Sequence, residues 1–148
     1  MAPEVQVTYT TADLDTLART VFGEARGEPP EGQYAVAHVV LNRVKRAPRY
    51  GGYTITEVCR KPFQFSCWLP DDPNYHLLLA ANVQQPTFLR AFGVACMVVS
   101  GAVGDPTGGA THYFVRQPPP GSKEWPPAWS KAMMRTVDIG AHSFFKEG

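Results

Sequence analysis

One glutamate, Glu24, stands where a helix-like segment gives way to residues that break helices. Apolar residues recur at helical spacing from position 14 to 22. The breakers that follow are Gly23, Gly27, Pro29 and Pro30. Apolar surroundings favour the neutral form of a carboxylic acid, so an acid in this position could donate a proton near neutral pH. The alternative is a helix C-terminus that ends in a solvated charge.

A second group of candidate residues lies in the segment 62–68, Pro-Phe-Gln-Phe-Ser-Cys-Trp. In an extended chain Gln64 and Ser66 would point the same way, as the polar groups of a cleft wall do. Core packing is the alternative interpretation of Phe63 and Phe65.

Two later segments add aromatic and polar groups. Thr111-His112-Tyr113 follows a double glycine, and the loop 118–129 carries Trp125 and Trp129, which either pack locally or stack on a ligand. Aromatic faces beside amide and hydroxyl groups suit a carbohydrate, and a nearby general acid suits cleavage of a glycosidic bond.

The elements that must position these residues are mostly helical. We predict an α+β fold, mostly α, with a buried central helix and a small β-hairpin or sheet near the C-terminus. Residues 1–11 form a flexible lead-in, and Thr11 or Asp13 caps the first helix. The expected helices are about 13–22, 31–46, 54–59, 75–83 and 86–103, and the expected β-like runs, which pair together, are 110–115 and 136–145.

The central helix carries one polar stripe, made of Tyr34, His38, Asn42 and Lys45 at three- or four-residue steps. The stripe is either an amphipathic edge with a hydrogen-bonded histidine or a face that looks into the cleft beside Glu24. In the last long helix, the expected core stripe is Phe88, Leu89, Phe92, Ala95, Cys96 and Val99.

Composition indicates one soluble globular domain over residues 1–148, which we expect to be monomeric. The chain is 44% hydrophobic and 18% charged, with a formal net charge of +1, which argues against a nucleic-acid partner. No apolar stretch reaches membrane-spanning length, so we expect no stable membrane insertion. A basic run between Arg43 and Lys61 is either a solvated face or an attraction for an acidic polymer such as a bacterial cell wall.

Three cysteines, Cys59, Cys67 and Cys96, show no paired spacing and are predicted to be reduced and mostly buried. We expect no metal ion and no cofactor. The first twelve residues have no signal-peptide core, which predicts synthesis and folding in the cytosol, or a mature fragment whose signal has been removed.

Several motifs together resemble the spore-cortex-lytic cell-wall hydrolases. They occur in the family's order and cover about Leu14 to Lys146. The matching segments are Phe22-Gly-Glu-Ala-Arg-Gly-Glu28, Glu31-Gly-Gln-Tyr-Ala-Val-Ala37, Leu41-Asn-Arg-Val44, Gln64-Phe-Ser66, Thr107-Gly-Gly-Ala-Thr-His-Tyr113 and Ile139-Gly-Ala-His-Ser-Phe-Phe145.

This resemblance implies a lysozyme-like fold and cleavage of peptidoglycan between its alternating amino sugars. The resemblance also implies that Glu24 is the catalytic acid and that Arg26 and Glu28 hold the loop that follows the first helix. The candidate substrate-binding residues are Gln64, Phe65, Ser66, Thr111, His112, Tyr113 and Trp129. The missing export signal and wall-binding domain, with Cys67-Trp68 after the Gln-Phe-Ser segment, differ from the usual pattern. The first two differences lead us to expect a phage-type lysin that is made in host cytosol and reaches the wall through a membrane lesion.

The sequence offers no obvious second carboxylate for the reaction, because Glu28, Glu31, Asp105 and Asp138 lie across breaks or far along the chain. The C6 hydroxyl of the sugar could then attack, giving a 1,6-anhydro product, with attack by water as the alternative.

Two rival functions are weighed against this one. A zinc amidase or peptidase would use His112 and His142 with Asp138 or Cys67 as a third ligand, although no short metal-binding motif is present. A sugar-binding or virion structural module would have the cleft without turnover.

Overall fold

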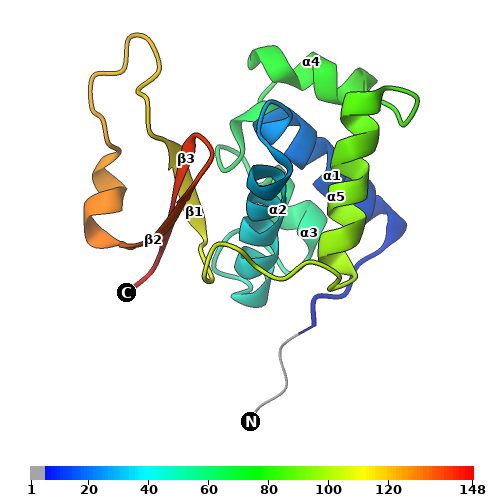
Figure 1. Cartoon of the computed structure of the whole chain (residues 1–148), viewed down its shortest axis with the longest axis horizontal. Helices are drawn as coiled ribbons and strands as arrows, with labels where there is room; N and C mark the ends of the chain where they lie inside the picture. The colour runs from blue at the N-terminus through cyan, green and yellow to red at the C-terminus, as the bar shows by residue number, and fades with distance from the viewer. Residues whose placement is uncertain (1–5) are drawn as a thin grey trace.

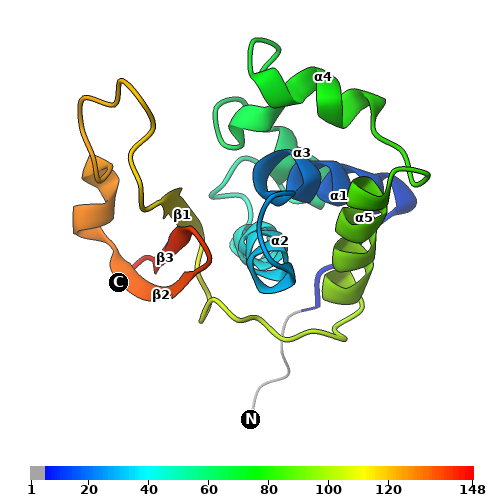
Figure 2. The same ribbon diagram turned by 45° about the horizontal axis from the view of Figure 1, so that its top comes forward.

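The computed structural model describes residues 6–148, so positions 1–5 of the expected lead-in lie outside the described residues. Five α-helices form one side of the molecule and a small sheet forms the other (Figures 1 and 2). The helices are α1 (Thr11–Ala25), α2 (Pro30–Lys45), α3 (Ile55–Arg60), α4 (Pro73–Ala80) and α5 (Pro86–Val99), with two short 3-10 helices, η1 (Ser66–Trp68) and η2 (Ala128–Ala132). The predicted mostly α fold with a small sheet near the C-terminus is confirmed.

Helix α1 begins and ends at other residues than the sequence predicted. Thr10 is its N-cap, in a capping box in which Thr10 and Asp13 exchange side-chain and backbone hydrogen bonds. The helix continues past Phe22 through Gly23 to Ala25, so the expected break at Gly23 is wrong. A glycine is tolerated within the helix because close packing needs it there: a Cβ atom on Gly23 would lie 2.7 Å from Cys67 Cβ. Glu24 therefore sits on the last turn of α1.

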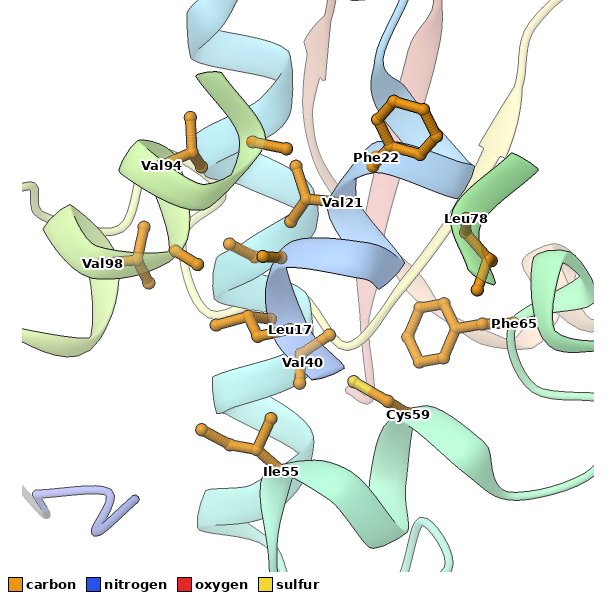
Figure 3. Packing of buried hydrophobic residues seen from close by; sticks show 14 of the residues in the cluster. Leu17, Val21, Phe22, Val40, Ile55, Cys59, Phe65, Leu78, Val94 and Val98 are labelled. Atoms are coloured by element: carbon orange, nitrogen blue, oxygen red, sulfur yellow. The ribbon is translucent and has the colours of Figure 1, made fainter. Parts of the chain in front are cut away.

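Helix α2 is the buried centre of the helical side, as predicted. It packs against α1, α3 and α5 and also touches β2. Its apolar residues join a core cluster drawn from every α-helix (Figure 3). The members of this cluster labelled in Figure 3 are Leu17, Val21, Phe22, Val40, Ile55, Cys59, Phe65, Leu78, Val94 and Val98.

The short helix α3 is confirmed, with Thr54 as its N-cap. Helices α4 and α5 each begin at a proline and end earlier than predicted. The expected core stripe of α5 is partly wrong, because Leu89 is exposed and Phe92, Cys96 and Val99 are only half-buried. The side chains that α5 buries are Phe88, Ala91, Val94, Ala95 and Val98.

The sheet has three antiparallel strands in the order β1-β3-β2, namely β1 (His112–Val115), β2 (Met134–Ile139) and β3 (His142–Lys146). The predicted single run 136–145 is in fact two strands joined by a turn at Gly140-Ala141, and its second half pairs with β1. At this turn Glu28 Oε1 accepts a hydrogen bond from Ala141 N at 2.9 Å. Gly140 has a φ of +55°, and a Cβ atom there would lie 2.6 Å from Glu28 Oε1. Glu28 thus fastens the sheet to the loop that follows α1.

Two members of the polar stripe on α2, His38 and Asn42, bind the segment 103–110 and not the surroundings of Glu24. His38 Nε2 donates to the Val103 carbonyl at 2.9 Å, and Asn42 Nδ2 donates both to Asp105 Oδ2 and to the Ala110 carbonyl, each at 2.9 Å. The structural interpretation of the stripe is confirmed. Within residues 6–148, no helix combines the length and hydropathy that crossing a bilayer requires.

The packing of Gly23 gives a stability prediction. Gly23→Ala should lower the free energy of unfolding by about 1–3 kcal/mol, because the added methyl group overpacks against Cys67. The matched control is Gly93→Ala in α5, where an added Cβ atom meets nothing within 4 Å. That control should raise the free energy of unfolding by about 0.5–1 kcal/mol through helix propensity. Urea unfolding of the two variants measures both effects, and equal effects would contradict the packing described.

Candidate active site

A groove of about 470 Å³ runs between the helical side and the sheet. The last turn of α1, the last turn of α2, the segment leading into η1, strand β1 and helix η2 each contribute to it. The residues that line it are Glu24, Arg43, Phe63, Gln64, Phe65, Ser66, His112, Tyr113 and Trp129. Folding therefore brings Glu24 together with all but one of the substrate-binding residues predicted from the sequence.

Two hydrogen-bond donors hold the Glu24 carboxylate in the groove. The Tyr113 hydroxyl donates to Oε1 at 2.7 Å, and the Cys67 backbone N–H donates to Oε2 at 3.3 Å. Burial raises the pKa of the Tyr113 phenol well above its usual value, and the adjacent Glu24 raises it further. Tyr113 therefore stays protonated and remains a donor. Because the C-terminal end of a helix disfavours negative charge, these two donors offset an unfavourable position for a carboxylate.

Arg43 is a buried charge that the sequence reasoning did not identify as part of the site. Its side chain is 5% exposed, and Nε donates to the Thr111 carbonyl at 2.7 Å. Nη1 donates to Gln64 Oε1 at 3.2 Å, and the guanidinium lies 4.9 Å from the centre of the Phe65 ring. Burial lowers the pKa of Arg43 below the ordinary value for arginine. Its position within the apolar run of a central helix could have marked it as a residue of the site, because a buried charge requires partners that hydrogen-bond to it.

The segment 63–66 lines the groove through a different backbone geometry from the one predicted. Ser66 begins a 3-10 helix, so the chain is not simply extended there. Gln64 and Ser66 nevertheless both remain exposed along the groove, while Phe65 is 2% exposed and packs in the core. Phe63 is 81% exposed. Core packing is therefore correct for Phe65 and wrong for Phe63.

Strand β1 supplies His112 and Tyr113 to the groove but not Thr111. Thr111 is fully buried, and its hydroxyl lies 2.9 Å from His112 Nδ1. The assignment of Thr111 to substrate binding is therefore wrong, because its side chain supports His112 from behind. Burial lowers the pKa of His112 to about 4, so the ring is neutral at pH 7.

The two loop tryptophans have different environments. Trp125 donates from Nε1 to the Val115 carbonyl at 3.1 Å and packs edge-on against Phe114, which supports the packing interpretation. Trp129 is 37% exposed, and its ring centre lies 5.1 Å from that of His112. It lines both the Glu24 groove and an adjoining hollow of about 670 Å³ beside Arg49.

The proposed zinc ligands do not come together in the folded chain. Residues 6–148 contain no group of three or more His, Cys, Asp or Glu side chains placed to hold a metal ion. His142 Nδ1 lies 3.0 Å from Glu28 Oε1 without hydrogen-bond alignment, and Asp138 accepts a hydrogen bond from Ser143. Burial raises the pKa of the Cys67 thiol far above its usual range, which makes it a poor metal ligand. All three cysteines are free.

Comparison with known proteins identifies the family. The model of a family described as Cell Wall Hydrolase matches residues 27–145. The chain belongs to this family.

The family's relatives include spore cortex-lytic enzymes from three bacteria. That of Halalkalibacterium halodurans is 31% identical over 97% of this chain and 37% of its own length. Those of Oceanobacillus iheyensis and Bacillus cereus are 33% and 32% identical over 93% of this chain, and over 43% and 46% of their own lengths. The chain thus spans less than half the length of these relatives.

Two solved structures share the fold. One is the catalytic domain of the germination-specific lytic transglycosylase SleB from Bacillus anthracis, with a TM-score of 0.71 and 30% identity over 96% of this chain and all of that one. The other is the catalytic domain of the Bacillus cereus SleB protein, with a TM-score of 0.70 and 29% identity over 99% of this chain and all of that one.

The neutral state of His112 gives a pH prediction. Its folded-state pKa of about 4 lies below the ordinary 6.5, so the unfolded chain binds a proton here that the folded chain does not. This contribution to stability is present above pH 6.5 and is lost as the pH falls toward 4. When the pH falls from 8 to 4.5, His112→Gln should lose about 2–3 kcal/mol less unfolding free energy than the native protein loses. Urea unfolding at the two pH values measures this, and a constant difference would contradict it.

Proposed function

We propose that this chain cleaves the β-1,4 bond between N-acetylmuramic acid and N-acetylglucosamine in peptidoglycan, with Glu24 as the general acid and base. One observation carries the proposal. Among the described residues that line the groove, Glu24 is the sole carboxylate, and two donors on other elements fix its position. The aromatic and amide groups around it suit a sugar strand.

The kinship of the chain supports the substrate class. Its family is described as Cell Wall Hydrolase, and its relatives are named as cortex-lytic enzymes and a lytic transglycosylase. Action on the bacterial cell wall follows from this proposal, and the phage-type origin remains a prediction from the sequence.

The proposed reaction uses one acid in two successive steps. Glu24 first donates its proton to the bridging oxygen as the C1–O bond breaks and an oxocarbenium-like centre develops at C1. The C6 hydroxyl of the same sugar then attacks C1. The carboxylate of Glu24 accepts the hydroxyl proton, which returns the enzyme to its starting state and leaves a 1,6-anhydro end.

The environments of the other carboxylates support attack by the C6 hydroxyl, because none of them lines the groove. Glu28 binds the Ala141 N–H, Asp105 accepts hydrogen bonds from Thr107 and Asn42, and Asp138 accepts one from Ser143. Glu31 is exposed in the first turn of α2. Within residues 6–148, no second carboxylate therefore lines the groove, where it could activate a water molecule.

Digestion of purified peptidoglycan tests this proposal. The native protein should release muropeptides with anhydro ends, one water lighter than the products of hydrolysis, as read by mass spectrometry. Glu24→Gln should lose turnover by about 10²–10⁴-fold, because an amide cannot donate or accept the proton in this way. Glu31→Gln is the matched control and should retain native turnover.

Each other outcome overturns a distinct part of the proposal. If all products had reducing ends, the nucleophile would be water and not the C6 hydroxyl. Unchanged lysis by Glu24→Gln would remove the catalytic assignment, and inhibition by EDTA with peptide products would favour the zinc amidase. Binding without any turnover would favour the non-catalytic module.

The Tyr113 hydroxyl gives a second prediction. Tyr113→Phe removes a hydrogen bond that orients the Glu24 carboxyl group, so kcat should fall by about ten- to a hundredfold with KM little changed. Tyr75→Phe in α4, away from the groove, is the control and should leave both constants unchanged. Steady-state rates on soluble peptidoglycan fragments measure the effect. A change confined to KM would mean that Tyr113 contacts substrate and does not position Glu24.

A further inference from the structure

Phe63 occupies a backbone position that suits glycine. The Gln64 N–H donates to the Lys61 carbonyl at 3.2 Å, which closes a four-residue turn with Pro62 in its second place and Phe63 in its third. Phe63 has a φ of +67°, and among the described residues it is the one non-glycine with a positive φ. Turns with proline second and a positive φ third strongly prefer glycine or asparagine there, because a side chain in this conformation is strained.

Core packing does not offset this strain. The Phe63 side chain is 81% exposed, the highest value among the large hydrophobic residues that the structure describes, ahead of Tyr53 at 68%. A large apolar ring left in water contributes no burial energy to the fold. Structural stability alone therefore gives no reason for a phenylalanine at this place.

The exposed ring instead borders the Glu24 groove. The residues before and after Phe63 both restrict its backbone. Pro62 restricts the backbone before it, and Gln64, directly after it, is held by Arg43 at 3.2 Å. The turn lies on the helical side of the groove, whereas η2, with Trp129, lies beyond the sheet in Figures 1 and 2. Exposed aromatic rings thus border one groove from two separate elements, and Glu24 lines the same groove.

We propose that Phe63 is a substrate-contacting residue whose ring stacks on the apolar face of a sugar ring in a glycan strand bound in the groove. The inference rests on the proposed function for the identity of the glycan. Aromatic rings bind pyranose rings by covering the C–H face and leaving the hydroxyl rim to polar partners, and Gln64 and Ser66 are the neighbouring polar groups. Phe63 therefore contributes to affinity for the glycan and does not take part in proton transfer.

The test separates the effect of the Phe63 ring on binding from the effect of the backbone conformation. Phe63→Gly removes the ring and suits the positive φ, while Phe63→Tyr keeps an aromatic ring. Tyr53→Ala is the control, because Tyr53 is also highly exposed and near in sequence but does not line the groove. Each substitution is made in the Glu24→Gln background, and binding to purified peptidoglycan is measured by sedimentation with increasing amounts of wall.

Phe63→Gly should weaken the apparent affinity for peptidoglycan by about three- to tenfold, the effect of losing one stacking contact. Its Tm should be equal to or higher than that of its parent, because the strained position now holds glycine. Phe63→Tyr should bind as the parent does, and so should Tyr53→Ala. With Glu24 restored, Phe63→Gly should raise KM on soluble fragments by a similar factor, with kcat close to native.

Three results would overturn the inference. The first is that Phe63→Gly binds peptidoglycan as tightly as its parent, and the second is that Phe63→Tyr loses as much affinity as Phe63→Gly. The third is that Phe63→Gly loses affinity and also has a lower Tm, which would indicate a structural role for Phe63. Failure of the proposed function has a different signature, namely no turnover by the native protein or full turnover by Glu24→Gln. Because binding is compared among variants that share one background, the Phe63 result is read separately from the turnover result.

Discussion

The hydrogen bond from Tyr113 to Glu24 joins the two sides of the molecule at the point where the proposed chemistry occurs. Glu24 belongs to the last turn of α1 and Tyr113 to the first strand of the sheet, 89 positions apart in the chain. Glu28 makes a second connection, from the loop after α1 to the β2–β3 turn. With the sheet fastened at both points, the space between it and the helices is a groove of fixed width with an oriented carboxylate.

Buried polar groups join the sheet to the helices in addition to apolar packing. The main core cluster lies among the helices, and the smaller cluster under the sheet has only five buried members. Arg43 reaches from α2 to Thr111 and Gln64, so one guanidinium sets both the start of β1 and the segment that leads into η1. A buried charge costs desolvation free energy, and its hydrogen bonds and ring contacts offset that cost. The site thus depends on charges whose roles appear only after folding.

The helices and the buried centre could be predicted because their signal is local. Apolar spacing identified α1, α2 and α5. The predictions that failed depended on distant partners. Gly23 was read as a helix breaker, but it lies inside α1 because Cys67 packs against it. Thr111 was assigned to the substrate, but it is buried behind His112. Arg43 and Phe63 were missed as site residues because an arginine in an apolar helix and a phenylalanine in an aromatic segment resemble ordinary packing until the fold gives their surroundings.

The most direct test of the central claim is a crystal structure of Glu24→Gln bound to a soluble peptidoglycan tetrasaccharide. The sugar strand should lie along the groove between the 63–66 segment and β1. One glycosidic oxygen should lie within about 3 Å of the side chain of residue 24, as proton transfer requires. A strand seated elsewhere on the protein, or crossing the groove with every glycosidic oxygen out of reach of residue 24, would contradict it.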